Sequence, residues 1–432
     1  MNIVHIIPGS GGGFYCGNCL RDGEMFKAVR NQGHNAIITP MYLPLFMECK
    51  NKNDVPVFFG AISIYLKHRF PFLQKLPNWV DGLLNSGPML KMAARLAGST
   101  RSTGLEDMTI SMLMGEHGKQ KDELEKLVSW LESHFKPDVV HISNALLLGL
   151  AKKLKERLNV PVFCSLQDED TWVDCMKTDA ANKAWELMHE SSKYVDLFIS
   201  VSKYYNIFMI DKLKLIEEKI KTLHLGVEPD NYKYINASEK PRNVGFLSRL
   251  NKANGLDILI DAFVELKNHE KNKDVRLILT GGYTADDSRY IKEQKAKIKK
   301  AGLNDDVIFM HSFENEGRKE FLNSVQVLSV PVRSGEAFGI YLLEAMASGI
   351  PVVQPAKGAF PEIIQKSGGG ITYDDNSASE LAKVLDELLN DKEKLKSLSL
   401  QARKGIEEGF NINYKAHEMI GFYLESVENF NF

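Results

Sequence analysis

The chain has 432 residues, with 54 Lys and Arg against 56 Asp and Glu, for a formal net charge of −2. At about 150 residues per domain, this length predicts two or three domains, each large enough to fold without disulfide or metal support. The hydrophobic content of 44% and charged content of 25% exclude a disordered or fibrous chain, and the balanced charge argues against general nucleic-acid binding.

In the first half, β-branched apolar runs alternate with helical patterns. Helices are expected at 21–33 and 145–158. Strands are predicted at 2–8, 35–42, 138–143, 160–166 and 197–202. This alternation is typical of βαβ units and predicts a parallel sheet covered by helices.

The alternation restarts after 223–242, a polar segment with two prolines that predicts a domain boundary. The second half predicts strands at 243–248, 275–282, 307–312, 325–331, 351–355 and 369–374, and helices at 257–269, about 287–301, 339–348 and about 379–430. We therefore predict two doubly wound, Rossmann-like α/β domains facing a cleft, where ligands bind at the carboxyl ends of strands. The expected domains are 1–235 and 236–412, with 413–432 as a terminal helix that crosses back to the first.

Residues 55–118 do not fit the alternation, because they are apolar, aromatic and interrupted by prolines. We interpret them as an insertion in the first domain. Two readings stay open: the insertion packs on its domain or forms a dimer contact, or it is an interfacial surface that dips into lipid. The second reading predicts a lipid-linked acceptor and peripheral attachment to the inner membrane face.

Five cysteines are few for this length and indicate a reducing compartment. Cys16 and Cys19 are two residues apart, but no second pair or histidine cluster completes four ligands, so structural thiols are favoured and no metal site is expected. The N-terminal run lacks the features of a signal peptide, and no window reaches the roughly 18 apolar residues of a membrane span. We expect a cytoplasmic protein.

The stretch 334–353 carries the strongest chemical signal. Glu336 stands in a strand-to-helix loop, and the backbone amides of Phe338, Gly339 and Ile340 surround the expected helix start, where unpaired N–H groups and the helix dipole can bind phosphate. Glu344, further along the helix, can accept hydrogen bonds from vicinal hydroxyls such as those of a ribose.

This stretch resembles the Glu-x7-Glu motif of family 4 retaining glycosyltransferases, which have the two-domain GT-B fold. A second match is 243–263, where Arg249 corresponds to the arginine that grips the donor diphosphate, a task suited to a planar guanidinium. Asn254 stands where the family has a lysine, and Lys252 lies two residues earlier.

Other matches follow the same resemblance. The glycine-rich run 8–18 is similar to the family's first loop, with Gly12 and Gly13 as the residues of close approach. His141 matches the first histidine of a strand-end His-x-His, and Gly281 lies in the glycine turn beside the nucleotide. Gln167 and Asp168 stand where many members carry a histidine, which implies different acceptor or sugar contacts.

The resemblance implies a retaining, metal-independent, hexosyltransferase-like enzyme that moves a sugar from a nucleotide-diphosphate donor to a hydroxyl of a glycan or lipid. A UDP-sugar is favoured as co-substrate, without a cofactor. In this mechanism Arg249, with Lys252 or Asn254, stabilises the leaving diphosphate, Glu336 positions sugar hydroxyls, and His141 serves the sugar and acceptor side.

Two alternatives stay open. One is a sugar-nucleotide 2-epimerase of the same fold. The other is a non-catalytic sugar-nucleotide binding protein, against which the joint presence of Arg249, Glu336 and Glu344 argues.

Overall fold

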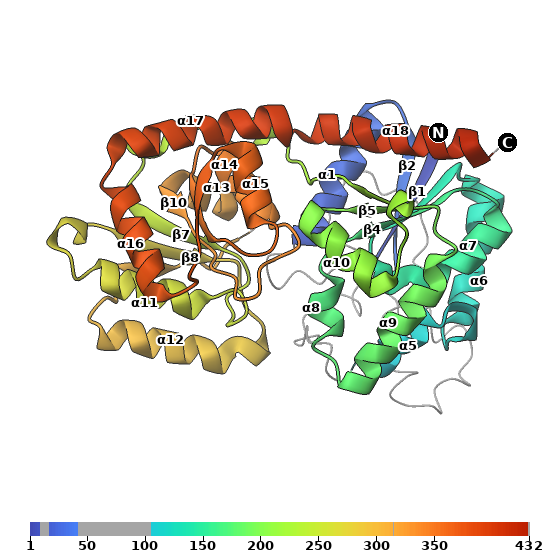
Figure 1. The fold of residues 1–432 in the computed structure, drawn as a ribbon, viewed down its shortest axis with the longest axis horizontal. Helices are drawn as coiled ribbons and strands as arrows, with labels where there is room; N and C mark the ends of the chain where they lie inside the picture. The colour runs from blue at the N-terminus through green and yellow to red at the C-terminus, as the bar shows by residue number, and fades with distance from the viewer. Residues whose placement is uncertain (9–16, 42–104, 314, 431–432) are drawn as a thin grey trace. The chain divides into compact units, whose positions relative to one another are not determined.

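The computed structural model describes residues 1–8, 17–41, 105–313 and 315–430, and these form two compact units (Figure 1). Unit 1 contains the described residues up to Leu223, except Gly17, together with the chain from Lys415 onwards. Unit 2 runs from His224 to Tyr414.

Unit 1 is built on a six-stranded parallel sheet in the order β2-β1-β3-β4-β5-β6. The strands are β1 (Asn2–Ile7), β2 (Asn35–Pro40), β3 (Val139–Ile142), β4 (Val162–Leu166), β5 (Leu197–Ser200) and β6 (Ile220–Thr222). Every residue of β3 and β4 is buried, as expected of parallel strands covered on both faces. The runs of β-branched residues predicted β1 to β5.

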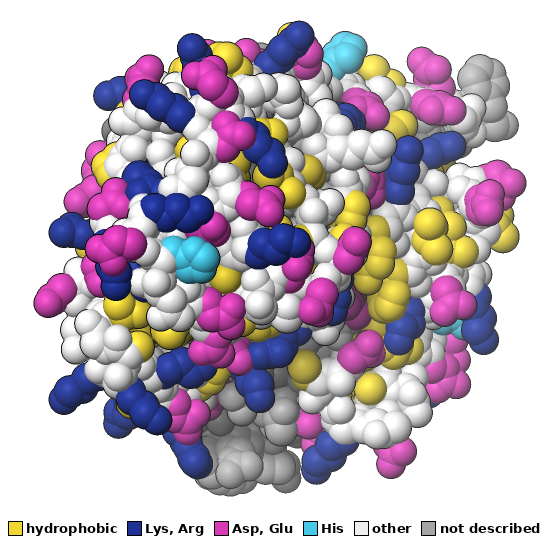
Figure 2. Space-filling model, turned by 60° about the vertical axis from the view of Figure 1, so that its left-hand side comes forward, with side chains coloured by type: hydrophobic (Ala, Val, Ile, Leu, Met, Phe, Trp, Pro, Cys, Tyr) yellow, Lys and Arg dark blue, Asp and Glu magenta, His cyan; other side chains and the backbone are white. Residues whose placement is uncertain are grey.

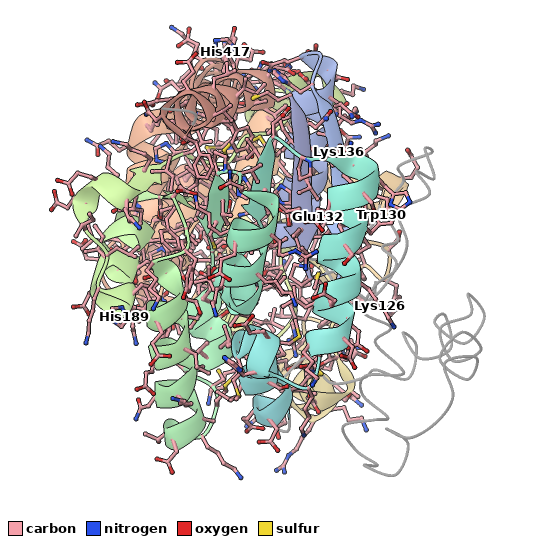
Figure 3. The ribbon with its side chains drawn as sticks, turned by 90° about the vertical axis from the view of Figure 1, so that its right-hand side faces the viewer. Lys126, Trp130, Glu132, Lys136, His189 and His417 are labelled. Carbon is pink, nitrogen blue, oxygen red and sulfur yellow. The ribbon has the colours of Figure 1, made fainter. Side chains whose placement is uncertain are left out.

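The helices of unit 1 are α1 (Gly17–Asn31), α5 (Glu106–Leu113), α6 (Lys121–Trp130), α7 (Ala151–Leu158), α8 (Glu169–Val173), α9 (Thr178–Ser192), α10 (Lys203–Leu213) and most of α18 (Ile412–Phe430). Helices α6 and α7 lie side by side, and Figure 3 shows Lys126 and Trp130 projecting outward from α6. Within the described residues, no helix combines the length and apolar character needed to span a membrane.

The single helix predicted at 145–158 is split into two. A 3-10 helix (Ala145–Leu150) precedes α7. Gly149 packs so closely on α5 that a Cβ atom there would lie 2.0 Å from the carbonyl oxygen of Met112. Backbone packing across the two segments, which periodicity does not encode, accompanies this tighter winding.

Unit 2 holds a second six-stranded parallel sheet, in the order β12-β11-β10-β7-β8-β9. Its strands are β7 (Asn243–Leu247), β8 (Arg276–Thr280), β9 (Val307–Phe309), β10 (Val327–Leu328), β11 (Val352–Pro355) and β12 (Gly370–Tyr373). Its helices are α11 (Leu256–Leu266), α12 (Ser288–Lys300), α13 (Asn315–Ser324), α14 (Ile340–Ala347), α15 (Phe360–Ser367), α16 (Ala378–Leu389) and α17 (Lys392–Gly409).

The strand order of unit 2 reverses between the neighbours β7 and β10. The chain continues to β8 and β9 on one side and to β11 and β12 on the other. In doubly wound sheets, ligands bind outside the carboxyl ends of strands at such a reversal. The loops that follow β7 and β10 are therefore the first place to look for a site, and they carry Arg249 and Glu336.

The surface shown in Figure 2 mixes basic and acidic side chains, and neither sign gathers into a broad patch on that face. This distribution agrees with the net charge of −2. It gives that face no electrostatic footprint of a nucleic-acid binding surface.

Candidate functional site

Arg249, in the loop after β7, is held by the segment that follows β8. Its Nε and Nη2 lie 3.0 Å and 2.7 Å from Oδ2 of Asp287, and Nη2 donates to Oγ1 of Thr284 at 2.8 Å. The Arg249 side chain is 18% exposed and that of Asp287 is 8% exposed. A nearly buried acid thus orients the guanidinium beyond the carboxyl ends of β7 and β8. This pair differs from an exposed salt bridge, which contributes little to stability.

Asn254 closes the same loop upon itself. Its Nδ2 donates to Oγ of Ser248 at 2.9 Å and to the carbonyl oxygen of Arg249 at 3.0 Å. Lys252 is exposed, and its carbonyl oxygen accepts a hydrogen bond from Nε of Arg333 at 3.1 Å. Asn254 therefore stabilises the backbone that carries Arg249, while Lys252 presents its charge to solvent.

Glycines let the backbones of neighbouring loops in unit 2 come into contact with one another. Gly281 has φ +125°, and a Cβ atom there would lie 2.1 Å from the carbonyl oxygen of Ser248. Gly255 has φ +74°, and its Cβ would lie 2.0 Å from the carbonyl oxygen of Pro331. The loops after β7, β8 and β10 consequently touch at points where no side chain fits.

Glu336 is fixed from two sides. Its Oε2 accepts the hydroxyl hydrogen of Tyr341, from the first turn of α14, at 2.6 Å. Its carbonyl oxygen accepts a hydrogen bond from the backbone N–H of Ala359 at 3.0 Å. The half-buried carboxylate therefore stands in a defined position where the loop after β10 enters α14.

Helix α14 begins at this carboxylate. Gly339 is its N-cap residue with φ +91°, and Phe338 and Ile340 on either side are buried. The first amides of a helix lack intrahelical partners and lie at the positive end of its dipole, so they favour an anion. This helix start and Arg249 leave the sheet from adjacent strands.

Glu344 lies on α14 and is 1% exposed. Its Oε1 accepts the hydroxyl hydrogen of Tyr232 at 3.1 Å and lies 3.2 Å from Nε of Arg318 on α13. The sequence reasoning missed both partners, since Tyr232 precedes Glu344 by 112 residues and Arg318 lies on another helix. Each carboxylate oxygen has two lone pairs, so Glu344 can accept further hydrogen bonds beside those from these partners.

His141 lies in the core of unit 1. Its Nδ1 is 2.5 Å from the hydroxyl of Tyr423 on α18, its Nε2 is 2.8 Å from Oγ of Ser165, and its ring stacks on His5. Burial holds the pKa of His141 well below its usual range, so the ring is neutral. Nδ1 therefore links β3 to α18, whereas Nε2 links β3 to the neighbouring strand β4.

Gln167 and Asp168 follow β4. The buried Gln167 donates through Nε2 to the carbonyl oxygen of Ser143 at 3.0 Å, and Asp168 adopts φ +55° before α8. The sequence reasoning passed over Glu169, which accepts hydrogen bonds from the backbone amides of Ala145 at 2.9 Å and Gln167 at 2.7 Å. Burial raises the pKa of Glu169 to about 7. The run of three acidic residues in 168–170 is the sequence feature that could have pointed to Glu169.

Several predicted features fall outside the described residues. These are Gly12, Gly13, Cys16 and the part of the insertion up to residue 104. Across the part of the chain that the structure describes, no three His, Cys, Asp or Glu side chains gather in a way that could hold a metal ion.

The arrangement within unit 2 suits one kind of ligand. Arg249 and the start of α14 attract negative charge at the reversal of strand order. The carboxylates of Glu336 and Glu344 can accept hydrogen bonds from hydroxyl groups. A molecule that carries both phosphate and vicinal hydroxyls would satisfy all four groups.

Comparison with known proteins agrees with this chemistry. Residues 228–405 match the family model described as glycosyl transferases group 1. An uncharacterized glycosyltransferase of Methanocaldococcus jannaschii is 24% identical over 335 residues, which cover 74% of this chain and 82% of the relative. A D-inositol 3-phosphate glycosyltransferase of Stackebrandtia nassauensis is 24% identical over 234 residues, or 51% of this chain and 52% of the relative.

Two solved structures share the fold over almost the whole chain. Anabaena HepE in complex with UDP aligns with a TM-score of 0.68 and 17% identity, covering 98% of this chain and all of that one. Sucrose-phosphate synthase from Thermosynechococcus elongatus aligns with a TM-score of 0.71 and 15% identity, covering 98% and 99%. Residues 228–405 are thus similar to the group 1 glycosyl transferases, and the two parallel α/β sheets of the chain have the GT-B fold.

Proposed function

We propose that this protein is a retaining glycosyltransferase that moves a sugar from a nucleotide-diphosphate donor to an acceptor hydroxyl. The observation that carries the proposal is the pairing of an anion site with hydroxyl acceptors in unit 2. Arg249 and the start of α14 provide the first, and Glu336 and Glu344 provide the second. The match to the group 1 family over the same residues supports it.

In the proposed donor complex, Arg249 and the first amides of α14 bind the diphosphate, and Lys252 adds charge from the solvent side. Glu344 accepts hydrogen bonds from the ribose hydroxyls, while Phe338 and Gly281 border the nucleotide. A UDP-sugar is our preferred donor, and a solved neighbour in complex with UDP supports that preference. We propose that these protein groups stabilise the diphosphate without a metal ion.

The proposed reaction is a front-face displacement. The acceptor oxygen bonds to the anomeric carbon on the side from which the diphosphate departs, and the departing phosphate oxygen takes the acceptor's proton. Arg249 stabilises the growing charge on the leaving group, which is an electrostatic contribution. Glu336 fixes the hydroxyls of the transferred sugar. His141 supports the unit 1 sheet, and we assign it no contact with the reacting atoms.

The acceptor is proposed to be a glycan or a lipid-linked sugar bound by unit 1, with Gln167 and Asp168 as candidate contacts at the carboxyl end of β4. The aromatic and basic sequence of 55–118 supports a lipid-linked acceptor and a peripheral membrane contact. Flotation with anionic liposomes tests this part. Efficient transfer to a soluble sugar, with no flotation of the wild-type protein, would contradict it.

The decisive experiment is a thermal-shift screen of UDP-, GDP- and ADP-sugars, followed by product analysis with and without EDTA. A ligand at 100 times its Kd stabilises the folded protein by about 2.7 kcal/mol. We expect one nucleotide class to bind, transfer to persist in EDTA, and the product to keep the donor's anomeric configuration by NMR. An epimerised nucleotide sugar without transfer would indicate the isomerase alternative, and binding without turnover would indicate a binding protein.

A further inference from the structure

Lys240 is a buried lysine in the boundary segment 223–242, just before β7, with 5% of its surface exposed. Its Nζ donates to the carbonyl oxygen of Leu322 at 2.8 Å and to that of Ser348 at 3.0 Å. Leu322 lies in the last turn of α13, and Ser348 is the C-cap residue of α14. One amino group therefore joins the carboxyl ends of the two helices.

Burial lowers the pKa of the Lys240 amine to about 7, and the amine has N–H groups to donate in either protonation state. The last carbonyl groups of a helix lack intrahelical donors and lie at the negative end of its dipole. Lys240 supplies donors to two such ends at once. Arg403 of α17 also supplies a donor at the end of α14. The Nη1 atom of Arg403 donates to the carbonyl oxygens of Ala347 at 2.9 Å and Tyr232 at 3.1 Å.

The same two helices meet again at Glu344. Arg318 of α13 lies 3.2 Å from its Oε1, and Tyr232 donates to that oxygen at 3.1 Å. The Arg318–Glu344 pair can form only if α13 and α14 keep a fixed spacing. Lys240 and the Arg318–Glu344 ion pair each link the two helices.

We infer that Lys240 is a positioning residue for nucleotide recognition, which acts by holding α13 against α14 so that Arg318 and Tyr232 orient the Glu344 carboxylate. The inference rests on the proposed function, in which Glu344 accepts hydrogen bonds from the ribose. Loss of the Lys240 amino group removes the donor that the two helix ends share and lets α13 shift. The carboxylate then loses its defined orientation toward vicinal hydroxyls.

Lys267 offers a matched control. It is also 5% exposed, and its Nζ donates to the carbonyl oxygen of Val275 at 3.0 Å and lies 3.1 Å from Oδ1 of Asp306. Lys267 therefore binds backbone of unit 2, as Lys240 does, but these contacts involve neither α13 nor α14. Lys267→Met therefore reproduces the general loss of stability without the proposed effect on Glu344.

The experiment measures calorimetric Kd values of UDP and 2′-deoxy-UDP, or of the corresponding pair for the nucleotide class selected in the thermal-shift screen. The wild-type protein is expected to prefer the ribonucleotide by tenfold or more. Lys240→Met should weaken ribonucleotide binding at least fivefold and reduce that preference. Lys267→Met should leave both values within twofold of wild type, although its melting temperature falls.

Each outcome decides one claim. Wild-type protein that binds no nucleotide diphosphate overturns the proposed function and this inference with it. Binding without a ribose preference, or Lys240→Met indistinguishable from Lys267→Met, overturns the inference alone. If circular dichroism shows that Lys240→Met is unfolded, Arg318→Met replaces it, because Arg318 is 20% exposed and less central to the core. Retention of the full ribose preference by Arg318→Met would also overturn the inference.

Discussion

The side-chain amide of Asn254 donates to Oγ of Ser248 at 2.9 Å, so the loop after β7 is closed by a residue that stands where the resembling family has a lysine. A neutral amide in this position adds no charge to a diphosphate site. It instead fixes the backbone from which Arg249 projects, since it also binds the Arg249 carbonyl oxygen.

Asn254→Ala should therefore weaken donor binding through loss of order rather than loss of charge. Each of its two hydrogen bonds contributes about 1 kcal/mol to stability, and we expect a severalfold rise in donor Kd by calorimetry. Asn206→Ala removes a comparable 3.0 Å bond to Thr222 in unit 1 and should leave the Kd unchanged. Equal donor Kd values for the two variants would show that the Asn254 hydrogen bonds do not contribute to donor binding.

Arg249→Ala should reduce kcat/KM by roughly 30-fold or more, because loss of one partner of a buried charged contact costs about 2–5 kcal/mol. Steady-state kinetics with the selected donor measure the effect. Arg289→Ala is the control, since that side chain is 93% exposed and paired with Glu293. Activity of Arg249→Ala within threefold of wild type would reject Arg249 as a diphosphate ligand.

Substitutions of Glu336 and Glu344 should change different kinetic constants. Glu336→Gln is expected to lower kcat about tenfold or more with little change in donor KM, because a group that acts in the transition state affects kcat. Glu344→Gln should mainly raise donor KM. The reverse pattern would exchange the roles assigned to the two residues.

Gly281→Ala should destabilise the protein and weaken donor binding. The added Cβ would lie 2.1 Å from the carbonyl oxygen of Ser248, at a φ of +125°, so the loops after β7 and β8 must separate. Gly421→Ala on the exposed side of α18 has open space and should stabilise by about 0.5–1 kcal/mol through helix propensity. Thermal melts of both variants check the contrast, which fails if Gly281→Ala melts at or above the wild-type temperature.

Glu169 should give unit 1 a pH-dependent stability. Burial raises its folded-state pKa from 4.5 to about 7, so between these values the folded state keeps a proton that the unfolded state has lost. Its contribution is fully present below pH 4.5 and is lost as the pH rises through 7, on the order of 3 kcal/mol. Relative to wild type, Glu169→Gln should thus gain stability between pH 5 and pH 8 in denaturant titrations. Glu190→Gln, at an exposed position on α9, should show no such trend.

Local sequence predicted the features that depend on neighbours along the chain. The strands follow from β-branched runs, and Glu336, Gly339 and Glu344 follow from one continuous stretch between β10 and β11. Their helix start has the residue pattern typical of an anion site, so an anionic ligand could be proposed there without coordinates.

Partners that lie far away in the sequence could not be predicted. Asp287 holds Arg249 across 38 residues, and Tyr232 reaches Glu344 across 112. The environment of His141 was hidden for the same reason, since a strand pattern indicates burial but not which helix covers the strand. Tyr423, at the other end of the chain, supplies one of its two hydrogen-bond partners.

The contact between His141 and Tyr423 also bears on biosynthesis, because 282 residues separate its two partners. At about 5–20 residues per second, a ribosome needs roughly 14–56 s to make that length of chain. During this interval the nascent sheet of unit 1 lacks the tyrosine that caps its buried histidine. Unit 1 contains the first residues of the chain but cannot complete this contact until the last residues have been made.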